Sequence, residues 1–139
     1  MSGGDIILGT GVDIVESTRI TSAMDKFGDR FLNRCFWPAE ISYCQSMKFP
    51  AQHLAARFAA KEAISKAFGT GIGRQLGWKD MEIRKRDSGE PYAVLHGKGE
   101  ELARARGVTR IFVSLSHSHD YAAAQAVIVG RPADAATKT

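Results

Sequence analysis

The sequence has few cysteines and no long apolar run. Its two cysteines, Cys35 and Cys44, match no zinc-binding spacing, so we expect reduced thiols in a cytoplasmic protein. A membrane-spanning helix needs about 18 or more consecutive apolar residues, and no such run occurs. The opening residues MSGGD lack a basic stretch followed by an apolar one, which predicts no secretory signal.

Two glycine-containing segments fail to complete a nucleotide-binding motif. Gly9-x-Gly11 follows an apolar segment, but Ile14 stands where a dinucleotide fingerprint requires its third glycine. The segment GTGIG at 69–73 is not followed by the Gly-Lys-Ser/Thr of a P-loop. Its backbone amides can still approach a phosphate closely, or Gly69 can simply end a helix.

Basic residues are in excess and unevenly distributed. The chain has 19 Lys and Arg against 15 Asp and Glu, a net charge of +4. Residues 57–86 hold eight basic and three acidic side chains. A phosphate-rich ligand or an acidic protein would be attracted there, although a solvated surface has the same composition. A nucleic-acid-binding domain with strongly salt-dependent binding is the main non-enzymatic alternative.

Hydrophobic patterning predicts one α+β domain. The 139 residues, 44% of them hydrophobic, suffice for one core. We expect strands over 5–15, 80–86, 91–96, 110–117 and 121–129, helices over 16–27, 38–47, 50–68 and 98–106, and irregular chain over 28–37. The helices would pack on a mainly antiparallel sheet. This domain would span 5–130, between flexible ends at 1–4 and 131–139.

An aspartate interrupts the first predicted strand. Asp13 has apolar neighbours, Val12, Ile14 and Val15. An ionised carboxylate is costly in such a place unless a cation or several hydrogen-bond donors satisfy it. Asp13 therefore either belongs to a polar site, or ends the strand and caps the following helix.

The longest predicted helix is apolar on nearly every side but carries four charged residues, Arg57, Lys61, Glu62 and Lys66. Such a helix should be buried, and buried charges need partners or a ligand. Glu62 and Lys66 can form a surface pair worth about 0.2–0.5 kcal/mol, or Glu62 can bind a metal while Lys66 faces an anion. Two carboxylates, Asp13 and Glu62, suit Mg²⁺, which keeps waters and takes further oxygens from substrate phosphates.

The segment 117–120, His-Ser-His-Asp, resembles a metal-binding cluster. Its spacing departs from His-x-His-x-Asp, because position 121 is Tyr. We expect a strand end and a turn here, with His117 able to contact a phosphate and His119 solvated. Ser116 and His117 are adjacent on a strand and point to opposite faces, so they are not a nucleophile–base pair.

Three segments resemble the small, single-domain bacterial holo-acyl-carrier-protein synthases of the 4'-phosphopantetheinyl transferase superfamily. They are GTGVDIVESTRI (9–20), RFAAKEAISKAFGTGIGRQLG (57–77) and VSLSHSHDYAAAQAVI (113–128), in that family's order and spacing. The resemblance implies a trimer with coenzyme A at each subunit interface. It also implies transfer of 4'-phosphopantetheine from coenzyme A to a serine of an acidic apo-acyl carrier protein, in support of fatty acid biosynthesis. Broader-specificity relatives for peptide or polyketide carriers are usually about twice as long, and the chain length favours the short type.

The resemblance also assigns residues. Asp13 and Glu62 would hold Mg²⁺ with the coenzyme A diphosphate, and Lys66 would lie close to the reacting phosphate. Arg57 and His117 would face the adenosine end and its 3'-phosphate from a neighbouring subunit. Further coenzyme A contacts would be Gly69, Gly71, Ser118 and, in the hairpin turn, Ser88, Gly89 and Pro91. Arg19 would meet the carrier protein, and neither nucleic acid nor a membrane is an expected partner.

Overall fold

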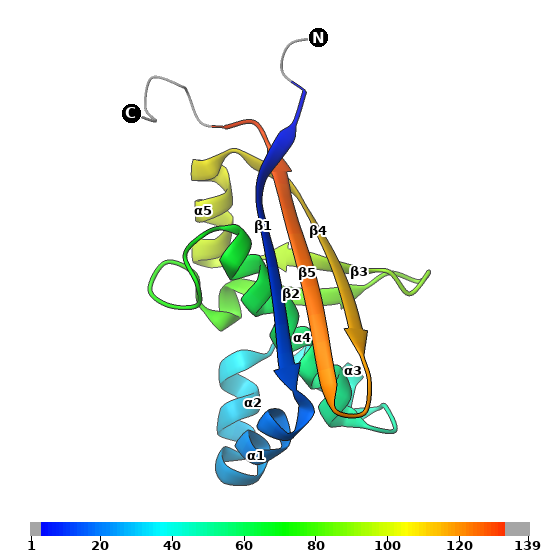
Figure 1. Ribbon diagram of the computed structural model, residues 1–139. Helices are drawn as coiled ribbons and strands as arrows, with labels where there is room; N and C mark the ends of the chain where they lie inside the picture. The colour runs from blue at the N-terminus through cyan, green and yellow to red at the C-terminus, as the bar shows by residue number, and fades with distance from the viewer. Residues whose placement is uncertain (1–3, 133–139) are drawn as a thin grey trace.

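The computed structural model describes residues 4–132 (Figure 1). The predicted flexible ends lie almost wholly outside this range. The elements are β1 (Ile6–Glu16), α1 (Ser17–Phe27), α2 (Asp29–Cys35), α3 (Pro38–Gln45), α4 (Pro50–Ala67), a 3₁₀ turn (Trp78–Asp80), β2 (Met81–Lys85), β3 (Pro91–Leu95), α5 (Gly97–Arg106), β4 (Val108–His117) and β5 (Tyr121–Gly130).

The strands form two antiparallel sheets. One has the order β1-β5-β4, and the other is the β2–β3 hairpin. Helix α4 packs along one face of the three-stranded sheet (Figure 1). The opposite face carries large exposed apolar side chains, including Val12, Ile14 and Phe112. The predicted α+β class with an antiparallel sheet is confirmed.

Glycines in β1 let α4 approach the sheet closely. A Cβ added at Gly9 would collide with the carbonyl oxygen of Ala67, and one at Gly11 with that of Ala63. The alanines of α4 form the other side of this contact, and several of them are fully buried. The Gly9-x-Gly11 pattern is therefore explained by helix–sheet packing, which fixes α4 over β1.

The prediction of irregular chain over 28–37 was wrong. Helix α2 fills most of that segment and buries Leu32 and Cys35 in the core. Gly28 lies between α1 and α2 and has a φ of +56°, a conformation that glycine adopts readily. The chain therefore changes direction at this one residue, and α2 follows α1 directly. The apolar positions of α2 are too few for a helical period to stand out in seven residues.

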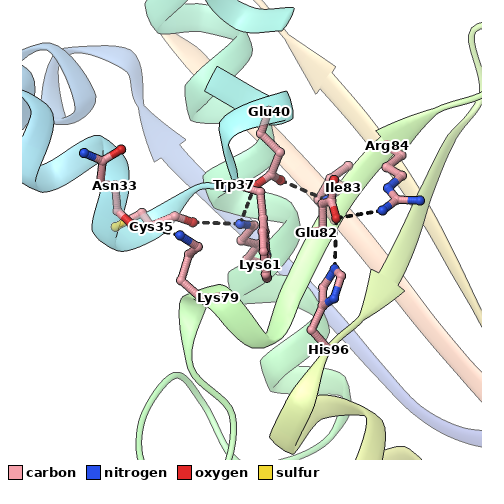
Figure 2. Close-up of polar contacts among 10 residues, drawn as sticks. All are labelled: Asn33, Cys35, Trp37, Glu40, Lys61, Lys79, Glu82, Ile83, Arg84 and His96. Atoms are coloured by element: carbon pink, nitrogen blue, oxygen red, sulfur yellow. Dashed lines mark hydrogen bonds and ion pairs between the residues drawn. The ribbon is translucent and has the colours of Figure 1, made fainter. Parts of the chain in front are cut away.

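A buried ion pair links α4 to α3 and, through further hydrogen bonds, to β2 (Figure 2). Lys61 is fully buried, and its Nζ donates to Glu40 Oε1 at 2.8 Å and to the Cys35 carbonyl at 2.7 Å. Glu40 also accepts from the backbone amides of Trp37 at 2.7 Å and Ile83 at 2.8 Å. Burial lowers the pKa of Lys61 and the carboxylate of Glu40 opposes that shift. This network joins α3, α4 and β2 and explains one of the four charges on α4.

Both cysteines are free and buried. Burial raises the pKa of the Cys44 thiol to about 11, and it raises the pKa of Cys35 as well. Within residues 4–132, no helix is both long and apolar enough to cross a membrane.

Candidate active site

Asp13 and Lys66 form the centre of the first cluster. Strand β1 continues past Asp13 to Glu16, so Asp13 does not cap α1. Lys66 Nζ lies 2.9 Å from Asp13 Oδ1 and donates to the carbonyl of Val12 at 3.1 Å. Lys66 is half-exposed, and its ion-pair partner among the described residues is Asp13 rather than Glu62. The packing of α4 on β1 therefore brings the side chains of Lys66 and Asp13 together.

Glu62 completes this cluster. Burial raises the pKa of Glu62, and the negative charge of Asp13 raises it further, while Lys66 and Arg19 oppose the shift. Two carboxylates that repel each other in this way are suited to share a cation. The described residues contain no group of three His, Cys, Asp or Glu side chains that could hold a metal alone. Asp13 and Glu62 therefore fit Mg²⁺, whose remaining positions would be left to waters and phosphate oxygens.

A second cluster surrounds the N-terminal half of α4. Arg57 is 6% exposed, and its guanidinium carbon lies 4.4 Å from the ring centroid of Tyr43. Tyr43 Oη accepts a hydrogen bond from Lys85 Nζ at 3.1 Å. The Nε of Arg57 is buried, and residues 4–132 provide no hydrogen-bond partner for it. A donor in this state costs free energy, and an anionic ligand would remove that cost.

Sequence reasoning did not single out His53 as part of the second cluster. The rings of His53 and His117 have centroids 4.8 Å apart, which places the end of β4 beside α4. Burial lowers the pKa of His53, and the nearby charges of His117, Arg57 and Lys85 lower it further. The available signal was its spacing, because His53 lies four residues before Arg57 on the same helix.

The two clusters lie on different sides of α4. Asp13 is on β1 and His117 on β4, and β5 separates these strands, so they run about 10 Å apart. Arg57 and Glu62 are five positions apart on α4, which corresponds to about 140° around its axis. One copy of the chain therefore presents two separate polar clusters, on different sides of α4.

The glycines after α4 are used in ending the helix. Gly69 and Gly71 have φ values of +80° and +66°. The amide of Gly69 donates to the Lys66 carbonyl at 2.9 Å, and those of Thr70 and Gly71 donate to the Ser65 carbonyl at 3.1 and 3.2 Å. The helix-ending role predicted for Gly69 is confirmed. These three amides are engaged, so a contact of Gly69 or Gly71 with a ligand would use other atoms.

The remaining predicted ligand contacts lie in or directly beside turns. Ser88 and Gly89 are exposed at the tip of the β2–β3 hairpin, and Pro91 begins β3. Ser118 is exposed directly after β4, and its amide donates to the Tyr121 carbonyl at 2.8 Å. His119 is solvated in the same turn, as predicted. Ser118 follows directly on His117 of the second cluster.

Arg19 lies beside the first cluster on α1. Its guanidinium carbon is 5.4 Å from the ring centroid of Phe58, and it lines a pocket of about 380 Å³ between α1 and α2. Arg30 and Arg34, which sequence reasoning did not select, line the same pocket. Aromatic side chains, among them Phe31, also line it. The pocket combines positive charge with an apolar surface, which suits an acidic protein partner.

Comparison with known proteins identifies the family. The family model described as the 4'-phosphopantetheinyl transferase superfamily matches residues 9–126. A holo-acyl-carrier-protein synthase of Koribacter versatilis is 47% identical over 123 residues, covering 88% of this chain and 98% of that protein. The corresponding protein of Chlamydia trachomatis serovar L2 is 48% identical over 121 residues, covering 87% and 98%.

Solved structures agree with the sequence comparison. The crystal structure of the Neisseria meningitidis synthase has a TM-score of 0.82 and 33% identity, covering 88% of this chain and 98% of that one. The Helicobacter pylori synthase, crystallised in complex with coenzyme A, has a TM-score of 0.77 and 33% identity, covering 86% and 98%. The chain therefore belongs to the 4'-phosphopantetheinyl transferase superfamily, among the holo-acyl-carrier-protein synthases.

Proposed function

We propose that this protein transfers 4'-phosphopantetheine from coenzyme A to a serine of apo-acyl carrier protein and releases adenosine 3',5'-bisphosphate. The observation that carries the proposal is the meeting of Lys66, Asp13 and Glu62 at the edge of the sheet, in a chain of this family. The Helicobacter pylori relative contains coenzyme A in its crystal structure. Membership of the family also supports a cytoplasmic role in fatty acid biosynthesis.

In this proposal Asp13 and Glu62 hold Mg²⁺ together with the diphosphate of coenzyme A. When bound there, Mg²⁺ would supply positive charge that offsets the charge of the diphosphate and of the leaving group. Asp13 and the Val12 carbonyl occupy two of the donor directions of Lys66 Nζ, and the third remains for a phosphate oxygen. Lys66 thereby stabilises negative charge in the transition state.

The transfer itself is a substitution at phosphorus. The serine oxygen of the carrier bonds to the β-phosphorus of coenzyme A, and the bond from that phosphorus to the bridging oxygen of the bisphosphate breaks. The serine proton passes to Glu62 or to a water. The raised pKa of Glu62 supports its candidacy as the acceptor.

The second cluster would bind the adenosine end from a neighbouring subunit. Arg57 and His117 would face the 3'-phosphate, with Ser118 close to His117. Ser88, Gly89 and Pro91 would lie near the adenine, and Gly69 and Gly71 near the rest of the molecule. Exposed apolar side chains on the open sheet face support association, and we infer a cyclic trimer with three interfacial sites. The transferase domain in this proposal spans residues 5–130.

The pocket between α1 and α2 would receive the carrier protein. Arg19, Arg30 and Arg34 line it together with aromatic side chains, and all three arginines are exposed. An acidic carrier helix placed there would bring its serine toward Glu62, because Arg19 is close enough to influence that carboxylate. We expect Arg19→Glu to raise the KM for the carrier far more than the KM for coenzyme A.

A mass-spectrometric assay tests the function. The protein is mixed with coenzyme A, Mg²⁺ and an apo-acyl carrier protein, and the carrier is then weighed. We expect the carrier to gain one phosphopantetheine, and the gain to disappear with EDTA. A carrier of unchanged mass, under conditions in which a known synthase modifies it fully, would refute the proposed activity. Full activity in EDTA would refute the metal site alone.

A further inference from the structure

A pocket of about 270 Å³ lies between α3, α4 and the β2–β3 hairpin. Its polar lining includes Tyr43, Arg57, Glu82, Arg84, Lys85 and Tyr92. Glu40 also borders it, but Lys61 neutralises that carboxylate. The remaining lining charges are three basic and one acidic, a net of +2. A phosphate monoester carries about −1.5 to −2 at neutral pH, which matches that charge.

Two observations indicate that this pocket can bind an anion. Arg57 is more than nine-tenths buried, and its Nε has no hydrogen-bond partner among the described residues. Lys85 is exposed, and its ammonium donates a hydrogen bond to the hydroxyl of Tyr43 rather than to a carboxylate. Both cations are therefore left without an acidic partner on the pocket wall.

Arg84 differs from these two because a buried acid fixes its position (Figure 2). Glu82 is 4% exposed, and its Oε1 accepts from Arg84 Nη2 at 3.0 Å and lies 2.9 Å from His96 Nε2. The residue between them, Ile83, is held by its amide to the buried carboxylate of Glu40 at 2.8 Å. The framework around Lys61 thus sets the position of the strand that carries Glu82 and Arg84.

The guanidinium of Arg84 keeps donors free after this contact. It has five N–H donors in a planar fork, and the bond to Glu82 uses one of them. The side chain of Arg84 is 46% exposed, so the free donors can reach a ligand. A guanidinium held in place loses little rotational freedom when it binds two oxygens of a phosphate.

We propose that Arg84, held by Glu82, is a further specificity-determining residue for the phosphate monoester at the adenosine end of coenzyme A. The inference rests on the proposed function, which brings that end of the substrate to Arg57. Arg84 would donate to the 3'-phosphate alongside Arg57. Glu82 acts as a positioning residue, because it touches Arg84 and not the substrate.

Steady-state kinetics with coenzyme A and 3'-dephospho-coenzyme A test this assignment. We expect Arg84→Ala to raise the KM for coenzyme A by about tenfold or more, the usual cost of a lost charge-assisted hydrogen bond. The KM for the dephosphorylated substrate should change little, so discrimination between the two should fall. Arg84→Lys keeps the charge but loses the planar set of donors. Its KM for coenzyme A should lie between those of the wild type and Arg84→Ala. Equal increases for both substrates, or unchanged discrimination, would overturn the proposal.

Two matched variants complete the design. Arg104→Ala removes an exposed arginine of α5, which pairs with Glu100 and does not line the pocket, and should leave both KM values unchanged. Glu82→Gln keeps the shape but weakens the hold on Arg84, so we expect a smaller rise in the KM for coenzyme A with kcat preserved. A KM unchanged by Glu82→Gln would remove the positioning role.

Calorimetry separates this proposal from the proposed function. Wild-type protein should bind adenosine 3',5'-bisphosphate more tightly than adenosine 5'-phosphate, and Arg84→Ala should remove most of that preference. This readout needs no turnover. A wild type that never modifies a carrier but shows the Arg84-dependent preference would refute the transfer reaction and keep the phosphate site. A preference that survives Arg84→Ala would refute the site.

Discussion

Helix α4 carries two lysines five positions apart that have opposite surroundings. Lys61 has no exposed surface and pairs with Glu40, which is equally buried. Lys66 is 49% exposed and pairs with Asp13 at nearly the same distance, 2.9 Å against 2.8 Å. Distance therefore does not distinguish the two pairs. Their accessibility does, because a buried pair cannot meet a substrate and an exposed pair can.

The difference predicts two separate kinds of damage. Breaking a buried pair leaves an uncompensated charge in the core, which typically costs about 3–5 kcal/mol of stability. An exposed pair contributes only about 0–1 kcal/mol. We infer that Lys61 serves the fold and Lys66 serves the reaction, although both belong to the segment RFAAKEAISK.

The largest expected effect comes from the carboxylate beside Lys66. Asp13→Asn keeps the shape of the side chain but removes the charge that the metal and Lys66 share. We expect the transfer rate to fall by about a thousandfold, the scale on which such electrostatic interactions act. The melting temperature should move little, because Asp13 is only partly buried. A variant that retained a tenth of the activity would contradict the metal site.

Lys61→Met should produce the largest loss of stability. It leaves the buried carboxylate of Glu40 without its cation, so we expect the free energy of unfolding in urea to fall by about 3–5 kcal/mol. The double variant Lys61→Met, Glu40→Gln removes both charges and should recover part of that loss. The protein that remains folded should keep its specific activity. If Lys61→Met were as stable as the wild type, the structural role would be wrong.

Lys66→Met is the matched variant. We expect kcat to fall by about 10²–10³, as when one charge-stabilising donor is removed from an active site. The free energy of unfolding should change by less than about 1 kcal/mol, because the pair is exposed. The contrast with Lys61→Met would disappear if both variants lost stability and activity together.

The raised pKa of Glu62 predicts a pH-dependent gain in stability when its charge is removed. Its ionisation is disfavoured in the folded protein, so Glu62 costs no stability below pH 4.5 but destabilises the fold as the pH rises through its raised pKa. In EDTA, Glu62→Gln should therefore raise the melting temperature at pH 7.5 and leave it unchanged at pH 4. Glu100→Gln, on the exposed face of α5, is the control for both pH values. The same melting temperature for Glu62→Gln and wild type at pH 7.5 would contradict the raised pKa that burial, and then Asp13, give Glu62.

The smallest effect concerns the buried thiols. Burial and the raised pKa of Cys44, about 11, should make both cysteines react slowly with a disulfide reagent at pH 8 until the protein unfolds. Lys61→Met should speed the reaction, because it loosens the network that includes the Cys35 carbonyl. Lys66→Met should not. Fast labelling of the native wild type would show that the core opens around α3 and α4.

Much of this arrangement follows from the sequence, because it depends on local pattern. In the part of the chain that the structure describes, the strands, four of the five α-helices and the unusual carboxylate at Asp13 were predicted from period and composition. The partner of Lys66 was not, since it lies on another element and only packing brings it near. The same is true of Glu40 beside Lys61 and of His53 beside His117.

The predicted basic surface shows the same limit. The excess of positive charge in residues 57–86 suggested one attractive region. The fold buries Arg57 and Lys61, ties Arg84 to Glu82, and leaves Lys66 on the side of Asp13. Net charge counts side chains but cannot say which way each one faces, so the nucleic-acid alternative loses its main support.

The central claim is that one active site combines the Asp13 side of α4 from one subunit with the Arg57 side from another. Asp13→Ala and Arg57→Met proteins, each inactive alone, are mixed in equal amounts, refolded, and checked for trimers by light scattering. Random assembly in a cyclic trimer leaves about one quarter of the interfaces with both halves intact, so we predict about a quarter of wild-type activity. Mixed trimers that stay as inactive as their parents, or a fully active monomer, would contradict the claim.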